Sequence, residues 1–337
     1  MKKKANIMNL KLIAYILFVI VILPACTKEN TTITKEKVAE KPKISKQVPS
    51  FDGKYAFETV AKQVSFGPRV PNTPFHLKCK DYLLAELSLY ADSVFVQSFD
   101  DYIEGEKVQL FNIVARFKGD DPSKVLLLGA HWDSRPLADE DPDPKKAAKS
   151  FDAANDGGSG VGVLLSMAKS FKSEKPPVNV DIVLFDGEDL GLHGSTEYFC
   201  RGSKYYTQQL TPLNRPSHVI ILDLVGDKEA QFTVEVNSNR SAPALIRSLW
   251  SVGLEVGNGT FANQIRYEIY DDHMPFIAMG IPAVDIIDAE LVGNNAYNPR
   301  RRYWHTADDT MENISESTLS AVGKTVLTFI YQHYPNL

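Results

Sequence analysis

Apolar runs alternate with amphipathic segments from about residue 51 to the end of the 337-residue chain. Alternating apolar and polar residues, the pattern of half-buried strands, occupy 94–99 and 110–117. Continuous apolar runs, typical of strands buried on both faces, occupy 125–130, 180–185 and 219–224, and a further strand is expected at 283–287. Helical spacing occupies 57–64, 76–88, 159–171, 242–252 and 315–331. Strands that alternate with helices predict one α/β domain over 51–337, with a mostly parallel, twisted central sheet flanked by helices.

The first 25 residues do not follow this pattern. A basic segment with Lys2, Lys3 and Lys4 precedes an uncharged, largely apolar run from Leu12 to Ala25. This run is shorter than the roughly 20 residues that a membrane-spanning helix needs, so it predicts a signal peptide over 1–25. Its end, a small residue followed by Cys26, resembles the bacterial lipobox, in which the cysteine is lipidated. The alternative is an ordinary cleaved signal with an incidental cysteine.

Residues 26–50 are polar and contain few aliphatic side chains. They cannot bury enough apolar surface to fold alone, which predicts a disordered tether. A lipid on Cys26 would make the protein a membrane-anchored lipoprotein that faces the periplasm of a bacterium. Cys79 and Cys200 remain, and two cysteines in an oxidising compartment can pair.

Composition narrows the class of protein. The chain is 44% hydrophobic and 23% charged, which is typical of globular proteins and excludes wholesale disorder or a polytopic membrane protein. The net charge is −5, and the part after residue 25 carries −9 without a basic stripe, so nucleic acid is not an expected partner.

Acidic residues and histidines follow the predicted strands or precede the predicted helices: His131, Asp156, Glu188, Asp189, Asp223, Asp271, His273 and His305. The carboxyl ends of parallel strands meet at one edge of a sheet, so these side chains are expected to lie together. Carboxylates and imidazoles are the ligands of catalytic metal sites. Any one of the acids, taken alone, is more often a helix cap or turn former.

Adjacent Glu188 and Asp189 are the most informative pair. Neighbouring side chains point in different directions, so one carboxylate can bind a metal while the other faces a substrate. Catalytic zinc takes three protein ligands and keeps one open position. Asp156, Asp189 and His305 would supply such a set. The sequence contains no Gly-x-Ser-x-Gly elbow, Walker loop or dinucleotide-binding fingerprint.

The segments that carry these residues resemble bacterial glutaminyl cyclases of the type that shares its fold with the animal enzymes, within the larger clan of zinc aminopeptidases. The matching segments are FGPRVP (66–71), GAHWDSRP (129–136), NDGGSGVGVLL (155–165), VLFDGED (183–189), LDLVGD (222–227), YDDHMPF (270–276) and YWHTADDT (303–310). The resemblance implies a zinc-aminopeptidase-like fold with a mixed sheet. It also implies cyclisation of the N-terminal glutamine of peptides and proteins to pyroglutamate, with release of ammonia.

The same resemblance implies residue roles. One zinc ion on Asp156, Asp189 and His305 would polarise the side-chain amide. Glu188 would move a proton from the α-amine to the departing ammonia, while Asp223 and Asp271 would share a proton and hold the amine. Trp304 would stack on the glutamine side chain, and Trp132 is expected in the core. Two departures from the family pattern are present: a tryptophan is missing after the Glu-Asp pair, where Tyr198 and Phe199 stand, and Arg300–Arg302 replace an apolar run.

Two alternatives stay open. A two-zinc aminopeptidase could use the same residues, with His131 as a metal ligand; in a one-zinc site His131 would lie behind the ligands. A catalytically inactive binding domain is the other alternative, although Glu188 and every candidate ligand are present. The cyclase reading is favoured by Asp271, where aminopeptidases commonly have serine, and by Trp304, where they commonly have tyrosine.

Overall fold

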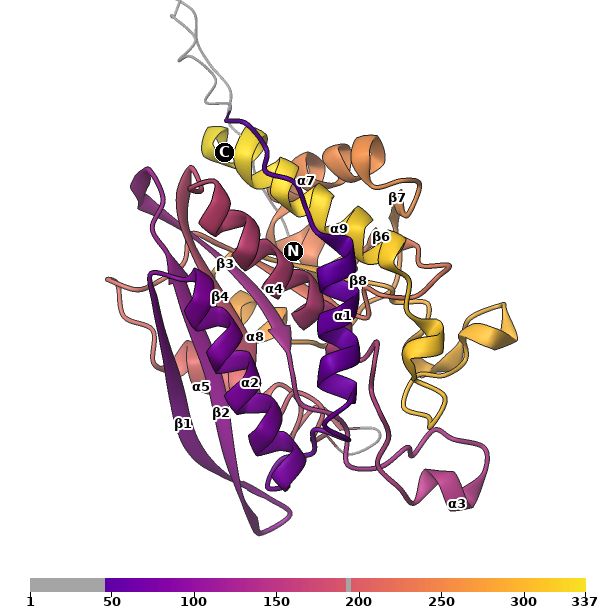
Figure 1. Ribbon diagram of the computed structural model, residues 1–337. Helices are drawn as coiled ribbons and strands as arrows, with labels where there is room; N and C mark the ends of the chain where they lie inside the picture. The colour runs from indigo at the N-terminus through magenta and orange to yellow at the C-terminus, as the bar shows by residue number, and fades with distance from the viewer. Residues whose placement is uncertain (1–45, 192–194) are drawn as a thin grey trace, which may run out of the picture. The chain divides into compact units, whose positions relative to one another are not determined.

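The computed structural model describes residues 46–191 and 195–337, and its central feature is a six-stranded mixed sheet (Figure 1). In spatial order the strands are β1 (Ser93–Ile103), β2 (Glu106–Phe117), β4 (Val178–Phe185), β3 (Asp121–His131), β5 (His218–Asp223) and β8 (Ala283–Ile287). Strands β4, β3, β5 and β8 run parallel, and the antiparallel β1–β2 hairpin joins β4 antiparallel. The predicted α/β class, with a mixed and mostly parallel sheet, is confirmed.

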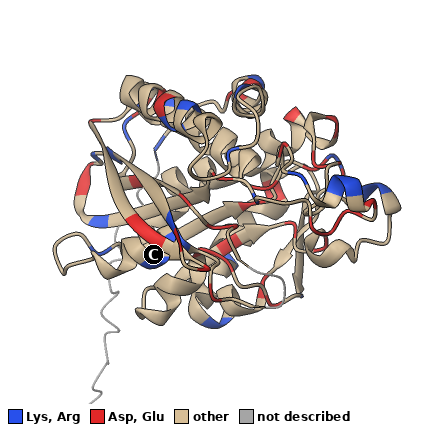
Figure 2. Ribbon diagram, turned by 90° about the horizontal axis from the view of Figure 1, so that it is seen from below, with Lys and Arg blue, Asp and Glu red and all other residues tan. Residues whose placement is uncertain are grey.

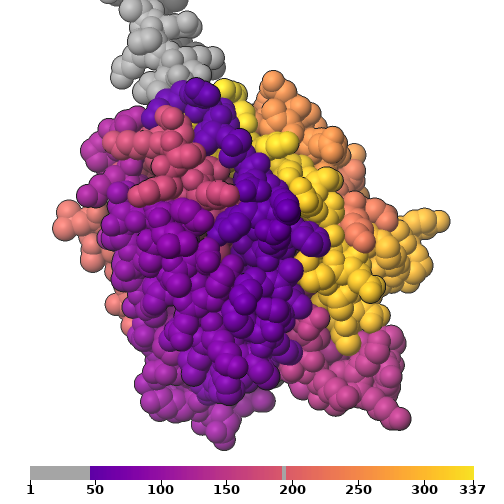
Figure 3. All heavy atoms as spheres, viewed as in Figure 1, coloured from indigo at the N-terminus to yellow at the C-terminus, as the bar shows by residue number. Residues whose placement is uncertain are grey.

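Five helices of the described chain cover one face of the sheet, and the larger part of the hydrophobic core lies between them and the sheet. They are α1 (Gly53–Val64), α2 (Pro74–Tyr90), α4 (Gly158–Ser173), α7 (Pro243–Val256) and α9 (Glu316–Thr328). Helices α1 and α9, from opposite ends of the described chain, lie side by side (Figure 3). Gly160 of α4 allows close packing on the sheet, because a Cβ there would lie 2.2 Å from the carbonyl oxygen of Leu222.

The other face has a smaller apolar core under two short helices. Leu127 and Val183 of the sheet pack with Tyr206 of α5 (Arg201–Gln208) and Phe276 of α8 (His273–Ala278). The remaining elements are α3 (Pro144–Ala147), α6 (Val236–Ser241) and a second, two-stranded sheet of β6 (Phe232–Val234) and β7 (Phe261–Ile265).

Each predicted strand and helix corresponds to an observed element, but the sequence pattern does not predict α3, α5, α6, α8, β6 or β7. Helix α5 is the clearest case: it buries Gly202, Ser203 and Thr207 beside Tyr206, so its buried face has no apolar periodicity. The helix predicted over 315–331 ends as an α-helix at Thr328 and continues as a π-helical turn, Phe329–His333.

The folded unit begins before the predicted boundary at residue 51. Lys46 forms an ion pair with Asp120, with 2.8 Å between Nζ and Oδ2, and the carbonyl of Ser50 accepts a hydrogen bond from Ser170 of α4. The predicted signal peptide (1–25), Cys26 and residues 26–45 of the predicted tether lie outside the described residues. In the part of the chain that the structure describes, no helix has the length and apolarity needed to cross a membrane.

Candidate functional site

The carboxyl ends of the central strands carry the predicted site. Strand β3 ends at His131, β5 ends at Asp223, and the turn after β4 carries Glu188 and Asp189. Viewed from below, Figure 2 shows acidic positions gathered among the strand ends and loops near the middle of the molecule. The sheet therefore positions these side chains as the strand pattern predicts.

Asp156, Asp189 and His305 form one compact group. Their candidate ligand atoms lie within 4.8 Å of one another, and all three side chains are buried. The Nε2 atom of His305 lies 3.3 Å from Oδ2 of Asp189 and 3.5 Å from Oδ2 of Asp156. Asp156 comes from the turn before α4, and His305 comes from the loop before α9. The structure thus brings together the three residues predicted as zinc ligands.

A second group shares Asp156. The Nε2 atom of His131 lies 3.1 Å from Oδ1 of Asp156 and 3.3 Å from Oδ1 of Asp223. The candidate ligand atoms of these three residues also lie within 4.8 Å of one another. The two oxygens of Asp156 therefore face two different groups, which is the arrangement that a two-metal site would need.

The first group fits a zinc ion. The Oδ2 atoms of Asp156 and Asp189 are buried and have no hydrogen-bond partner among the described residues. A buried carboxylate oxygen without a partner is costly, and a divalent cation would remove that cost. Two carboxylates and one imidazole are ligands that zinc accepts in catalytic sites.

Neighbouring side chains hold the ligands in place. Asp133 accepts hydrogen bonds from the backbone N–H groups of Glu188 and Asp189, at 3.0 and 3.2 Å. Arg135 donates to Oδ1 of Asp189 at 2.8 Å, and Asp309 accepts from the backbone N–H of Asp156 at 3.0 Å. Such partners orient metal ligands. Asp133 directly follows His131 and Trp132 at the end of the predicted strand 125–130, whereas the only sequence signal for Arg135 and Asp309 is membership in segments 129–136 and 303–310.

Three carboxylates line a small cavity of about 60 Å³ beside these ligands: Glu188, Asp223 and Asp271. Burial raises the pKa of Glu188 well above its ordinary value; His131 opposes this shift, and the carboxylate of Asp271 adds to it. Burial, with the nearby Asp223, raises the pKa of Asp271 to about 6. A carboxylate with a raised pKa is suited to proton transfer near neutral pH.

A buried charged cluster supports Asp271 from behind. His273 and Asp285 approach Asp271 with candidate ligand atoms within 4.8 Å, and Nε2 of His273 lies 3.3 Å from Oε2 of Glu235. Burial alone would raise the pKa of Glu235, but the interaction with His273 lowers it to about 2. Glu235 and Asp285 are not among the site residues predicted from the sequence. A signal exists for Asp285, an acidic residue inside the otherwise apolar strand AVDII.

The walls of the cavity are apolar and aromatic: Phe199, Ile269, Tyr270, Ile287, Val292 and Trp304. Trp304 is only partly buried, and its ring stacks on that of His305 with 3.5 Å between ring centroids. Phe199 lies in the segment where the family tryptophan is missing. Trp132, by contrast, is fully buried and stacks on His76 at 4.3 Å, so its predicted place in the core is confirmed.

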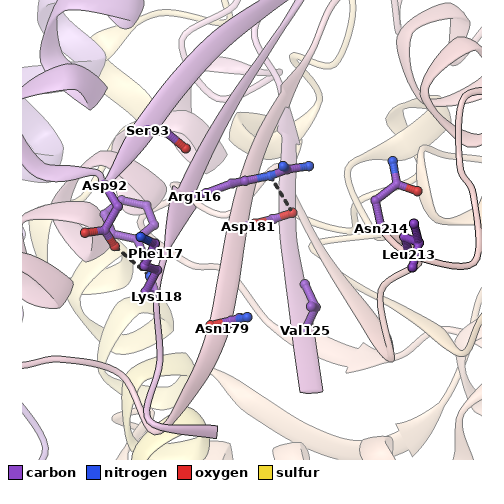
Figure 4. Close-up of a pocket in the computed structure, with 10 residues that line it drawn as sticks. All are labelled: Asp92, Ser93, Arg116, Phe117, Lys118, Val125, Asn179, Asp181, Leu213 and Asn214. Atoms are coloured by element: carbon purple, nitrogen blue, oxygen red, sulfur yellow. Dashed lines mark hydrogen bonds and ion pairs between the residues drawn. The ribbon is translucent and has the colours of Figure 1, made fainter. Parts of the chain in front are cut away.

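A larger cavity, of about 390 Å³, lies elsewhere in the structure (Figure 4). It includes Val125 and Asn179, near the amino ends of β3 and β4, and its Arg116 and Asp181 form an ion pair at 3.5 Å. Its lining contains neither histidine nor cysteine. This cavity therefore lacks the combination of histidine and carboxylates that is found at the carboxyl ends of the strands.

Cys79 and Cys200, the two cysteines in the described part of the chain, are both buried and free. They do not pair with each other. Cys200 lies at the site, where its thiol donates to Oε1 of Glu188 with 3.4 Å between sulfur and oxygen. No sequence pattern indicated this contact.

The loop that carries Trp304 and His305 is held by Arg301. This side chain is 5% exposed and forms ion pairs with Asp227, Asp288 and Glu290. Asp227 also accepts a hydrogen bond from the Tyr303 hydroxyl at 2.7 Å. The basic run therefore places one arginine inside the protein as a structural clamp, which the resemblance alone did not indicate.

Arg301→Ala is expected to lower the free energy of unfolding by about 3–5 kcal/mol, because it leaves the buried carboxylate of Asp288 without its cation and leaves Asp227 with Arg300 alone. Chemical denaturation measures this loss. Arg302→Ala is the matched control, since Arg302 is exposed and should change the same quantity by less than about 0.5 kcal/mol. Equal losses in the two variants would contradict the clamp.

A mixed sheet whose carboxyl edge gathers aspartates and histidines beside a small pocket defines the class of zinc-aminopeptidase-like α/β proteins. The chain belongs to peptidase family M28, whose model matches residues 112–330.

Within this family the chain is similar to bacterial glutaminyl cyclases. The structure of Tannerella forsythia glutaminyl cyclase is 39% identical, covers 85% of this chain and 100% of its own, and has a TM-score of 0.79. Bacteroides thetaiotaomicron glutaminyl cyclase bound to N-acetylhistamine is 35% identical, with the same coverage and TM-score. A Zn-dependent exopeptidase from Parabacteroides distasonis is 39% identical, with coverage of 85% and 100% and a TM-score of 0.80.

More distant similarity extends to a curated animal protein. The glutaminyl-peptide cyclotransferase of Boiga irregularis is 25% identical over an alignment of 241 positions that covers 62% of this chain. The match covers 61% of the length of that relative. The predicted resemblance to the glutaminyl cyclase family is confirmed by these comparisons.

Proposed function

We propose that the protein is a zinc-dependent glutaminyl-peptide cyclotransferase, an acyltransferase that converts N-terminal glutamine to pyroglutamate and releases ammonia. The observation that carries the proposal is the position of Asp271, which lines one small cavity with Glu188, Asp223 and the three candidate zinc ligands. A third free carboxylate suits a reaction that must hold an amine while a proton moves. Similarity to solved glutaminyl cyclases over their full length supports it.

The substrate's own geometry sets what the protein must do. The α-amine attacks the side-chain amide carbon of the same residue, and ammonia leaves. Because the reaction is intramolecular, holding the residue in a folded conformation supplies several kcal/mol of the barrier. The apolar and aromatic residues of the cavity wall would contact the methylene groups of a folded glutamine residue.

Proton transfer is assigned to the carboxylates. Glu188 accepts the proton from the α-amine and returns it to the departing ammonia. Asp223 and Asp271 hold the amine, since paired carboxylates favour one shared proton. Asp156, Asp189 and His305 would hold a zinc ion, which would supply Lewis-acid polarisation of the amide carbonyl.

One assay tests the function. The purified protein is incubated with a glutamine-initiated peptide and with an otherwise identical alanine-initiated peptide, and products are identified by mass. Loss of one ammonia from the first peptide, with no shortening of either, supports the cyclase. Removal of the first residue would identify an aminopeptidase instead.

The aminopeptidase is the second candidate, because His131, Asp156 and Asp223 form the second group that a two-metal hydrolase needs. A Bacteroides thetaiotaomicron structure described as a leucine aminopeptidase precursor is 36% identical and covers 85% of this chain, with a TM-score of 0.78. In that reaction Glu188 would activate a water molecule.

Trp304→Ala is expected to raise KM for glutamine-initiated peptides by about threefold to tenfold, because an aromatic contact contributes roughly 0.5–1.5 kcal/mol beyond the area it buries. Trp304→Phe should recover part of this loss. Steady-state kinetics and melting temperature are measured on the same samples. An unchanged KM in a well-folded alanine variant would exclude the stacking role.

Trp132→Ala is the matched control for the tryptophan. Trp132 lies in the core, so its loss should destabilise the fold by about 3–5 kcal/mol. If Trp304→Ala behaves in the same way, Trp304 is a packing residue.

We also propose that the protein is exported and anchored in a bacterial membrane through a lipid on Cys26, facing the periplasm. The sequence of residues 1–26 supports this proposal. Cys26→Ser should move the protein from the membrane fraction to the soluble periplasmic fraction; an unchanged distribution would rule out the lipid anchor.

A further inference from the structure

Three potential metal ligands meet next to the proposed zinc ligands without belonging to them. The candidate ligand atoms of Glu188, Cys200 and Asp271 lie within 4.8 Å of one another. The sulfur of Cys200 is 3.4 Å from Oε1 of Glu188. The proposed reaction uses the two carboxylates and gives no role to the thiol.

The backbone fixes the thiol in this position. Cys200 precedes α5 in a left-handed conformation, with φ 57°. Its N–H donates to the carbonyl of Glu188 at 2.9 Å, and the bridge between Asp189 and Phe199 joins the same two segments. The side chain is fully buried. The contact between Cys200 and Glu188 is therefore built into the fold rather than left to a mobile side chain.

The group also contains an oxygen without a partner. Oδ2 of Asp271 is buried and accepts no hydrogen bond from any described residue, and Asp271 is only 4% exposed. The carboxyl groups of Asp223, Asp272 and Asp285 crowd around Asp271. An additional cation would therefore stabilise this part of the site electrostatically.

We infer that Glu188, Cys200 and Asp271 form an inhibitory metal site, separate from both groups that share Asp156. This site is selective for thiophilic divalent cations such as excess Zn²⁺ or Cd²⁺. A thiolate favours such ions over Mg²⁺ or Ca²⁺. Binding replaces the proton of the thiol, which leaves to solvent, and involves no change of oxidation state. Glu188 and Asp271 line the cavity, so the ion can reach the group from the substrate side.

Occupancy of this site inhibits the enzyme, a consequence that rests on the proposed role of Glu188. A carboxylate bound to the ion cannot accept a proton from the substrate. The Cys200 thiol is fully buried and donates a hydrogen bond to Glu188, so the incoming ion must break this contact as it displaces the thiol proton. We therefore expect the site on Asp156, Asp189 and His305 to fill first.

Cadmium titration of the zinc-loaded full chain carrying Cys26→Ser tests the inference. Cadmium bound to a thiolate absorbs in the ultraviolet, and this absorption should saturate at one ion per chain while the bound zinc, measured by mass spectrometry, stays in place. Cys200→Ser should abolish the absorption. Cys79→Ser is the matched control, because Cys79 is also buried and free but packs in the apolar core; it should retain the signal.

A second variant covers the case in which Cys200→Ser does not fold. Asp271→Asn keeps the thiol and removes one anionic ligand, so the cadmium concentration at half-saturation should rise by at least about tenfold. Absorption that is absent in the parent protein, or unchanged in Cys200→Ser, overturns the site; so does an unchanged half-saturation in Asp271→Asn. These readings need no turnover, so they do not depend on whether the proposed reaction is correct.

Enzyme activity provides a further test of the inferred metal site. Cadmium should inhibit the parent protein over the same concentrations at which the absorption grows. In Cys200→Ser the inhibitory concentration, compared with the activity of that variant without cadmium, should rise by at least about tenfold. Inhibition without thiolate absorption would overturn the inference and point to an ion on His131, Asp156 and Asp223.

Discussion

Glu188→Gln is expected to lower kcat by at least about 10²–10⁴-fold, the usual contribution of a general acid–base group. The substitution keeps the shape of the side chain and removes its ability to accept a proton. The backbone of residue 188 is held by Asp133, so the turn should stay in place. Steady-state kinetics measures the loss, and zinc content measured on the same sample should remain that of the parent protein.

Glu197→Gln is the matched control for this prediction. Glu197, like Glu188, lies between β4 and α5, but its side chain is exposed. The same chemical change there should leave kcat within about twofold, as expected for a surface substitution. Retained turnover in Glu188→Gln would transfer the proton-accepting role to another carboxylate of the cavity, with Asp223 as the first candidate.

The sheet could be predicted from the sequence because its parallel strands are buried on both faces. Runs such as 125–130 and 180–185 are short continuous apolar segments between turn signals, which is typical of strands buried on both faces. Helix α5 could not be predicted, because its buried face consists of glycine, serine and threonine beside Tyr206. These small side chains allow the helix to pack closely on its neighbours. Because they are not strongly hydrophobic, they leave no hydrophobic periodicity in the sequence.

The candidate zinc ligands could be predicted for a related reason. Strand ends fix where Asp189 lies relative to β4, and local turns fix Asp156 before α4, so position along the chain translates into position in space. Cys200 and Asp285 could not be placed in this way. Cys200 precedes α5 and His273 begins α8, two helices that the apolar pattern does not predict, so the contacts of Cys200 with Glu188 and of Asp285 with His273 and Asp271 follow only from the assembled fold.

Removal of the metal should abolish activity, and added zinc should restore it. The expected stoichiometry for full recovery is one zinc ion per chain, because the proposed reaction needs a single Lewis acid on Asp156, Asp189 and His305. Metal content by mass spectrometry, measured alongside activity during readdition, tests this. Full activity after verified removal of all metal would contradict the role of zinc.

Two histidine variants separate the one-zinc site from the two-zinc alternative. His305→Gln removes a proposed ligand and should lose both the ion and the activity. His131→Gln should keep one zinc ion per chain if His131 only lies behind the ligands, although its contacts to Asp156 and Asp223, at 3.1 and 3.3 Å, predict some loss of rate. In a two-zinc enzyme the parent protein would hold two ions, and His131→Gln would lose one of them. The geometry of Asp156, which presents one oxygen to each histidine, makes this pair of variants the most direct count of metal ions at the site.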